Sequence, residues 1–277
     1  MRLGMVIDCE RCIGCYNCFL TCQDEFCGNA YEGYAAAAPM EGHNWMRILE
    51  EERGQYPRVK VSYTPKPCMH CADAPCIAAA QNGAVYRRPD GIVVIDPVKA
   101  AGQKQLLEAC PYRAIEWNEE AQLAQKCDLC AHALDKGEKE PRCVESCPTN
   151  AIVFGDMDDP ASEISRLIAE GRTEALNPEF ELKESVRYLG LPKRFIAGTV
   201  VLKDKRECAQ KARVELWNGA LAGVVTTNNF GDFEFDGVES NQSFQLKVSL
   251  PGYQEAEAPC TSFTDTHVGE IYLSPAV

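Results

Sequence analysis

The sequence lacks long apolar runs, and it has fewer basic residues than acidic ones. No stretch approaches the roughly 20 apolar residues of a membrane-spanning helix, and residues 1–8 show no charged segment followed by an apolar one, as a signal peptide would. Lysine and arginine number 28 against 41 aspartate and glutamate, a net charge of -13. Nucleic acid phosphates would be repelled by this charge. We expect no membrane span and no nucleic acid partner, and a cytoplasmic protein or one exported folded with a signal-bearing partner.

The usual signs of a catalytic centre are also missing. The chain has no Gly-rich dinucleotide loop, no nucleophile with an adjacent base and no paired carboxylates at a readable spacing. Cysteine, in contrast, is abundant, with 16 residues in 277. We therefore expect a metal-binding chain that is not itself catalytic.

The most informative stretch spaces four cysteines as C-x2-C-x2-C-x3-C between Cys12 and Cys22. In two-cluster ferredoxins the first three thiols of such a run bind one 4Fe-4S cluster and the fourth binds the other cluster. A partner run between Cys127 and Cys147 ends in the same C-x3-C-P pattern. The exchange predicts one cluster on Cys12, Cys15, Cys18 and Cys147. It predicts a second on Cys22, Cys127, Cys130 and Cys143.

A second unit lies inside the loop between these two runs. Its four thiols predict a third cluster, on Cys68, Cys71, Cys76 and Cys110. A complete unit would carry a fourth cluster through four further cysteines. The chain has instead Ala80, Ala100, Gln103 and Leu106. We predict that this fourth site is erased as a whole and left empty.

Other uses of cysteine stay open at this point. Cys127, Cys130, Cys143 and Cys147 taken alone would suit a structural zinc site. Cys9 allows another register of the first run, but that register needs a cysteine where the chain has Phe19. Cys27 stands outside every ligand spacing, and a bridge between Cys208 and Cys260 remains possible.

The expected fold class is α+β, with tandem ferredoxin-like modules followed by a small all-β, immunoglobulin-like sandwich. The length suggests about two domains. We place the iron–sulfur domain at residues 1–195, with an inner module at about 66–117 and a helical and extended wrap at 155–195. The β-sandwich follows at 196–277, because short alternating runs recur there between turn signals.

Local patterns add further expectations. Residues 83–86 and 92–96 flank Asp90-Gly91 and predict a hairpin, and residues 99–109 predict a helix running into Cys110. Asp159 before Pro160 predicts a helix N-cap. We expect His43 and Trp45 to pack a loop and His267 to lie on a surface strand. Lys126 either raises the reduction potential of a cluster or faces solvent.

Together these motifs resemble the iron–sulfur subunits of the dimethyl sulfoxide reductase superfamily of molybdopterin enzymes. The resemblance covers about residues 1–195 and includes Asp90-Gly-Ile-Val93 and Gln125-Lys126-Cys127. With Gly42-His-Asn-Trp-Met46, the missing cluster and the appended β domain, it is most similar to the transhydroxylase small subunits that act with pyrogallol and phloroglucinol.

The resemblance implies a heterodimer in which this chain relays electrons to or from a large catalytic subunit. That partner would carry molybdopterin guanine dinucleotide with molybdenum or tungsten and act on a polyhydroxylated aromatic ring. Related catechol dehydroxylases are an alternative, and they would need an external electron donor. A freestanding polyferredoxin is a third possibility, which the β domain and the long insertions disfavour.

Overall fold

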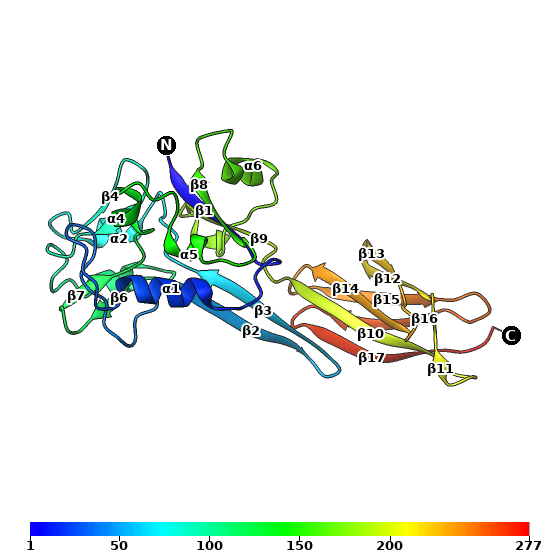
Figure 1. Ribbon diagram of the computed structural model, residues 1–277. Coiled ribbons are helices and arrows are strands. Elements are labelled where there is room, and N and C mark those ends of the chain that lie inside the picture. Colours follow the sequence, from blue (N-terminus) through cyan, green and yellow to red (C-terminus); the bar gives the residue numbers. More distant parts are fainter. Residues whose placement is uncertain (277) are drawn as a thin grey trace. The chain divides into compact units, whose positions relative to one another are not determined.

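In the computed structural model, which describes residues 1–276, the chain starts with the central strand of a three-stranded sheet (Figure 1). Strand β1 (Leu3–Asp8) pairs antiparallel with β8 (Ile152–Asp156) and parallel with β9 (Val186–Leu189). Both faces of β1 are buried. Met5 and Ile7 belong to the cysteine-rich core, whereas Val6 packs with Ile164 of helix α6 (Glu163–Ala169).

Short helices and hairpins complete the first compact unit, which comprises Met1–Glu50 and Tyr63–Leu191. The remaining helical segments are α1 (Asn17–Phe26), α2 (Pro75–Ala79), α3 (Gln105–Ala109), α4 (Ala131–Leu134), α5 (Arg142–Glu145) and the 3-10 turn η1 (Pro178–Phe180). The hairpins are β2 (Arg47–Gln55) with β3 (Arg58–Lys66), β4 (Val85–Arg87) with β5 (Val93–Ile95), and β6 (Glu116–Asn118) with β7 (Leu123–Gln125). The hairpin expected around Asp90-Gly91 is thus confirmed.

Two local predictions are wrong. The helix expected at 99–109 is only α3, because turns occupy residues 97–100 and Gly102 adopts φ +75°. Helix α6 is capped by Ser162, whose hydroxyl accepts the N–H of Ser165 at 3.1 Å, and not by Asp159. Asp159 instead accepts the N–H of Ala161 at 2.9 Å and forms the turn that precedes the helix.

Protein atoms fill the positions where a fourth cluster would need cysteines, which agrees with the predicted loss of that site. Ala100 and Leu106 are fully buried in a small apolar core with Val85 and Ile95. Gln103 is buried beside them, and its amide spans the loop: Oε1 accepts the N–H of Gln81 at 2.9 Å, and Nε2 donates to the Gln81 carbonyl at 3.1 Å. A hydrogen-bonded side chain therefore closes the loop at this place.

The second compact unit comprises Glu51–Ser62 and Pro192–Val277. In one of its sheets, β10 (Arg194–Leu202) pairs antiparallel with β11 (Glu207–Cys208) and β14 (Asp232–Val238) and parallel with β17 (Thr266–Leu273). The other sheet has the order β13 (Ala220–Thr226), β12 (Arg213–Asn218), β15 (Ser243–Ser249) and β16 (Ala256–Thr261). Alternate residues of both sheets share one apolar core, among them Val200, Leu216, Phe233 and Leu246.

The division along the sequence differs slightly from the expected one. The units change at Leu191 and Pro192, whereas the sequence suggested 195 and 196. The tip of the β2–β3 hairpin also counts with the second unit, although it lies within the segment assigned to the first. No helix in residues 1–276 is both long and apolar enough to cross a bilayer.

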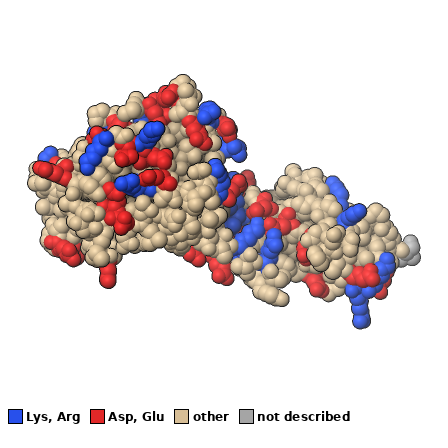
Figure 2. Space-filling view, in the orientation of Figure 1, with Lys and Arg blue, Asp and Glu red and all other residues tan. Residues whose placement is uncertain are grey.

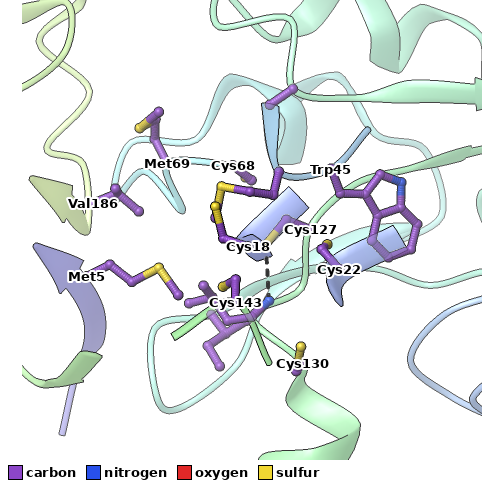
Figure 3. Close-up of a cluster of buried hydrophobic side chains, with 14 of the residues drawn as sticks. Met5, Cys18, Cys22, Trp45, Cys68, Met69, Cys127, Cys130, Cys143 and Val186 are labelled. Carbon is purple, nitrogen blue, oxygen red and sulfur yellow. Dashed lines mark hydrogen bonds between the residues drawn. The ribbon is translucent and has the colours of Figure 1, made fainter. Parts of the chain in front are cut away.

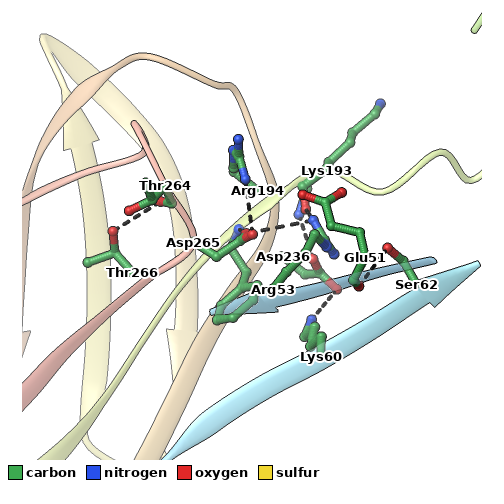
Figure 4. A network of polar contacts seen from close by, with 12 residues as sticks. Glu51, Arg53, Lys60, Ser62, Lys193, Arg194, Asp236, Thr264, Asp265 and Thr266 are labelled. Atoms are coloured by element: carbon green, nitrogen blue, oxygen red, sulfur yellow. Dashed lines mark hydrogen bonds and ion pairs between the residues drawn. The ribbon is translucent and has the colours of Figure 1, made fainter. Parts of the chain in front are cut away.

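Opposite charges lie next to one another in both units. Figure 2 shows acidic and basic side chains intermixed over the visible face. In the first unit, Arg88 contacts Asp135 at 2.7 Å and Arg142 contacts Glu25 at 3.0 Å. In the second, Asp265 is buried and accepts from the backbone N–H of Phe195 at 2.9 Å and from Arg194 at 3.1 Å, with Arg53 at 3.7 Å (Figure 4). The second unit thus contains a buried ion pair at the base of β10.

We predict that Asp265→Ala destabilises the protein by about 3–5 kcal/mol, because Arg53 would remain buried without its carboxylate. Asp236→Ala is the matched control. Asp236 contacts Lys60 at 2.8 Å but its side chain is 64% exposed, and its loss should cost under about 1 kcal/mol. Urea denaturation followed by tryptophan fluorescence measures both. Equal losses of unfolding free energy in the two variants would contradict a larger contribution from the buried ion pair.

We predict that Gln103→Ala lowers the free energy of unfolding by about 1–3 kcal/mol without changing the iron content, because it removes hydrogen bonds but no thiol. Gln105→Ala is the control. Gln105 is exposed and donates only to Gln103, at 3.2 Å, so its loss should cost under about 0.5 kcal/mol. Iron analysis and thermal denaturation of both variants provide the measurement. A fall in iron in Gln103→Ala would contradict a purely structural role.

Candidate iron–sulfur centres

The first cysteine run forms a tight loop ahead of helix α1. Gly14 adopts φ +65°, and a Cβ there would meet the ring of Tyr63 at 2.6 Å, so the close approach requires glycine. Tyr16 is also left-handed and starts the helix. Cys18 and Cys22 then lie one turn apart on α1, where residues at i and i+4 share a face.

One cavity brings together the four thiols predicted for the first cluster. It holds about 340 Å³ of empty space, and its lining includes Cys12, Cys15, Cys18 and Cys147. Burial, followed by the charges of Cys12, Cys147 and Cys15, raises the pKa of Cys18 to about 12. The N–H of Ala151 donates to Cys147 Sγ at 3.3 Å. A residue more than a hundred positions downstream thus completes the set of the first run.

The second set of thiols is deeply buried. Burial raises the pKa of Cys143 well above its usual range, and the nearby charges of Cys127, Cys22 and Cys130 raise it further. Figure 3 shows these four cysteines in the core of the first unit. The N–H of Leu129 donates to Cys127 Sγ at 3.4 Å. Since Cys147 lies with the first set, the four thiols that could have made a zinc site are divided between two places.

Helix packing explains this exchange. Helix α1 packs against α5. Along α1 the chain passes from the first set at Cys18 to the second at Cys22. It passes back from Cys143 on α5 to Cys147, which lies two residues after the end of that helix. Four residues of helix span about 6 Å. Helix α1, and α5 with the turn that follows it, therefore each supply one thiol to each set.

The inner thiols line a separate cavity. Its cysteines are Cys68, Cys71, Cys76 and Cys110. Arg87 holds the first loop by donating to the carbonyls of Cys71 and Ala72, each at 2.6 Å. The N–H of Ala114 donates to Cys110 Sγ at 3.5 Å. The segment that includes Lys183 and Ser185 closes the loop from outside, through hydrogen bonds with Ala72 and Met69 at 3.0 Å.

The second set has neighbours in both other sets. Besides burial, the charge of Cys18 contributes to the raised pKa of Cys143, and the charge of Cys68 contributes to the pKa of Cys127, which rises to about 12. Such electrostatic effects require short separations. Cys143 therefore lies near Cys18 of the first set, and Cys127 lies near Cys68 of the inner set.

Two buried polar side chains line the inner cavity. Lys126 is 4% exposed and donates to the carbonyls of Val93 and, at 3.0 Å, of Cys127. The solvent-facing alternative for Lys126 is thus wrong. His70 is completely buried, and its Nδ1 accepts the N–H of Val93 at 3.0 Å. Burial, followed by the charges of Lys126 and Arg87, lowers the pKa of His70 well below its usual range.

The remaining cysteines stand apart from these sets. Cys9 contacts the Thr64 hydroxyl at 4.0 Å and is absent from the lining of the first cavity. Cys27 lies 3.1 Å from the sulfur of Met40. Cys208 is exposed, Cys260 is buried, and both are free thiols, so the possible bridge between them is not formed.

The structure also shows where Trp45, His43 and His267 lie. Trp45 is buried and packs against Phe26 in a tilted arrangement with ring centroids 4.3 Å apart, and His43 contacts the Trp117 carbonyl at 3.0 Å. Both residues therefore pack a loop, as predicted. His267 is half-buried on β17, and its Nδ1 accepts the N–H of Gly269 at 3.1 Å.

The thiol sets fit iron–sulfur clusters on two observations. Each of the two cavities has four cysteine sulfurs in its lining, and backbone N–H groups donate to the sulfurs of Cys110, Cys127 and Cys147. Hydrogen bonds of this kind are typical of cluster thiolates and tune their potentials. Because burial raises the pKa of most of these thiols, binding iron would require them to lose protons.

Sequence reasoning missed His70 and Asp128. His70 stands between two cysteines of a spacing motif, and Asp128 follows Cys127 and accepts the N–H of Cys130 at 2.9 Å. Neither position has a periodic or motif signal. Only their burial in the fold distinguishes them.

Known proteins place this chain among iron–sulfur subunits. Residues 59–157 match the family described as a 4Fe-4S dicluster domain. The chain is 41% identical to the pyrogallol hydroxytransferase small subunit of Pelobacter acidigallici, over 97% of this chain and 98% of that one. It is 36% identical to a sulfite dehydrogenase subunit of Allochromatium vinosum, over 68% and 82% of the two chains. It is 30% identical to the arsenate respiratory reductase iron-sulfur subunit ArrB of Shewanella sp. strain ANA-3, over 68% and 96%.

These relatives match the chain along most of their own length, and in the first of them the match includes the β-rich second unit. The chain therefore belongs to the family of iron–sulfur electron-transfer subunits that includes the small subunit of pyrogallol hydroxytransferase.

Proposed function

We propose that the chain carries three 4Fe-4S clusters and exchanges electrons with a large subunit that holds a molybdopterin cofactor with molybdenum or tungsten. The observation that carries this proposal is the meeting of Cys147 with Cys12, Cys15 and Cys18 around one cavity. A shared cavity between two distant cysteine runs is what the two-cluster ferredoxin exchange requires.

The proposed ligands follow the three thiol sets. The first cluster binds Cys12, Cys15, Cys18 and Cys147. The second binds Cys22, Cys127, Cys130 and Cys143. The third binds Cys68, Cys71, Cys76 and Cys110. Each bound cluster supplies a site that takes up and releases one electron, with a potential somewhere between about -700 and +450 mV.

The chain's own residues hold and shield these groups. The thiols provide the ligands, and the N–H groups of Ala114, Leu129 and Ala151 donate to sulfur and so stabilise negative charge there. Burial of the second set excludes water. With four cysteines at each site, every iron has a protein ligand, so the chain relays electrons and the reaction takes place in the partner.

For the partner we propose a substrate of the polyhydroxylated aromatic class, with transfer of a hydroxyl group between rings. The support is the similarity to the pyrogallol hydroxytransferase small subunit along nearly the whole of both chains. Transfer of hydroxyl from one ring to another has no net electron demand. The clusters then supply and recover electrons within a turnover, and no external donor is needed.

A second candidate is the subunit of a reductive catechol dehydroxylase. The similarity to subunits of redox enzymes, such as the arsenate respiratory reductase iron-sulfur subunit ArrB, favours it. Removal of a ring hydroxyl as water consumes two electrons and two protons per turnover. An external donor would then have to dock on this complex.

We also propose that the two compact units are separate domains. The first would contain the two ferredoxin-like modules, one inserted into the other. In the second, the two sheets around one apolar core would form an immunoglobulin-like sandwich.

We predict that the complex, purified without oxygen, contains about twelve irons per copy of this chain, since three cubanes of four irons give 3 × 4 = 12. Molybdenum or tungsten should co-purify in a larger partner. Incubation with pyrogallol or a catechol, with and without a reductant, separates the two candidates. Turnover without reductant supports hydroxyl transfer, and turnover only with reductant supports dehydroxylation. Zinc in place of iron would refute both.

We predict that Cys76→Ala lowers the iron content from about twelve toward eight, because it removes a ligand of one cluster only. Cys27→Ala is the control, since that thiol contacts only Met40 and should leave the iron unchanged. Iron analysis and the ultraviolet–visible absorbance of the clusters measure both variants. Full iron retention in Cys76→Ala would contradict the ligand assignment.

A further inference from the structure

His70 has one ring nitrogen without a partner in the interior of the first unit. The side chain is completely buried, and its Nδ1 accepts the N–H of Val93 at 3.0 Å. A nitrogen that accepts a hydrogen bond carries no proton, so the imidazole proton is on Nε2. His70 therefore presents an N–H donor at Nε2.

That donor finds no acceptor among residues 1–276. A buried N–H left without an acceptor costs about 1–3 kcal/mol. His70 and Val93 both line the inner cavity, together with Cys68, Cys76 and their two companion thiols. A group that fills this cavity and offers sulfur acceptors would satisfy the imidazole.

Both backbone polar groups of Val93 are hydrogen-bonded. Its N–H donates to His70, and its carbonyl accepts from Lys126, which also donates to the Cys127 carbonyl at 3.0 Å. The imidazole is therefore fixed by the backbone of β5. A fixed donor in a buried site interacts strongly with a nearby negative charge.

We propose that His70 donates a hydrogen bond through Nε2 to a sulfur of the cluster on Cys68, Cys71, Cys76 and Cys110, and that this bond raises the reduction potential of that cluster. The inference rests on the proposed function, since it requires this cluster. Reduction adds one negative charge to the cluster. A donor to its sulfur therefore stabilises the reduced form more than the oxidised form.

The residue at position 70 allows a closely matched substitution. His70 has φ 43°, and asparagine is among the residues that tolerate this left-handed conformation best. In His70→Asn, the side-chain oxygen can replace Nδ1 as the acceptor for Val93, whereas nothing replaces the donor at Nε2. In His70→Gln, the side-chain amide can replace the Nε2 donor.

The test uses the complete complex with 15N-labelled histidine, reduced in steps and followed by pulsed electron paramagnetic resonance. We expect a histidine nitrogen coupled to one reduced cluster, and loss of this coupling in His70→Asn. The midpoint potential of that cluster should shift to a more negative value, while the other two clusters keep theirs. His70→Gln should recover most of the potential without the histidine coupling. His267→Asn, which alters a histidine with a similar Nδ1 contact in the second unit, should change neither measurement.

Three results would overturn the proposal: no histidine coupling in the unaltered complex, a coupling that survives in His70→Asn, or an unchanged set of potentials in that variant. If His70→Asn fails to assemble, His70→Gln decides, since it should lose the histidine coupling and keep most of the potential. Iron analysis separates this inference from the proposed function. About twelve irons without the coupling would refute only the role of His70, whereas about eight irons would refute the inner cluster itself.

Discussion

The exchange of thiols between helix α1 and the segment from α5 to Cys147 is the constraint on which the first unit depends. Cys18 and Cys147 line one cavity, and Cys22 and Cys143 belong to the neighbouring set, so each of these two segments supplies both sets. Strand β1 precedes α1 in the sequence, and β8 follows α5. The two strands pair with each other, which joins residues 3–8 to 152–156. Cysteines from all three sets belong to the buried core of this unit, so the proposed clusters would contribute folding free energy directly, as metal centres do in small domains.

Side chains close the inner part of the first unit at the positions where a fourth cluster would need cysteines. These positions are Ala80, Ala100, Gln103 and Leu106, and apolar packing and the amide of Gln103 fill the space. The amide pairs with both backbone groups of Gln81, which fastens the loop after α2 to the turn before α3. Hydrogen bonds and apolar contacts thus hold the chain together at this place. The neighbouring inner cavity has all four of its thiols.

Cysteine spacing predicted the three thiol sets, because ligation geometry restricts which thiols can meet. Alternating runs also predicted the β-rich second unit, as with Phe244, Leu246 and Val248 on β15. Strand β16 lacks a clear alternation because Pro259 and small residues interrupt its apolar pattern, and an edge strand tolerates proline. The helix at 99–109 was overestimated because its composition did not reveal that the Gln103 side chain binds the Lys99 carbonyl at 2.8 Å. The roles of His70 and Lys126 depend on tertiary burial, which no local pattern encodes.

The proximity of the three sets bears on how electrons would move. Cys143 of the second set lies near Cys18 of the first, and Cys127 lies near Cys68 of the inner set. A buried ammonium and a buried imidazole N–H are both at the inner cavity. Positive charge and hydrogen bonding favour the reduced cluster, so the inner site would retain an electron more readily than a similar site without them. A site that retains an electron suits a reaction in which electrons leave the partner and return within one turnover, as hydroxyl transfer between rings requires.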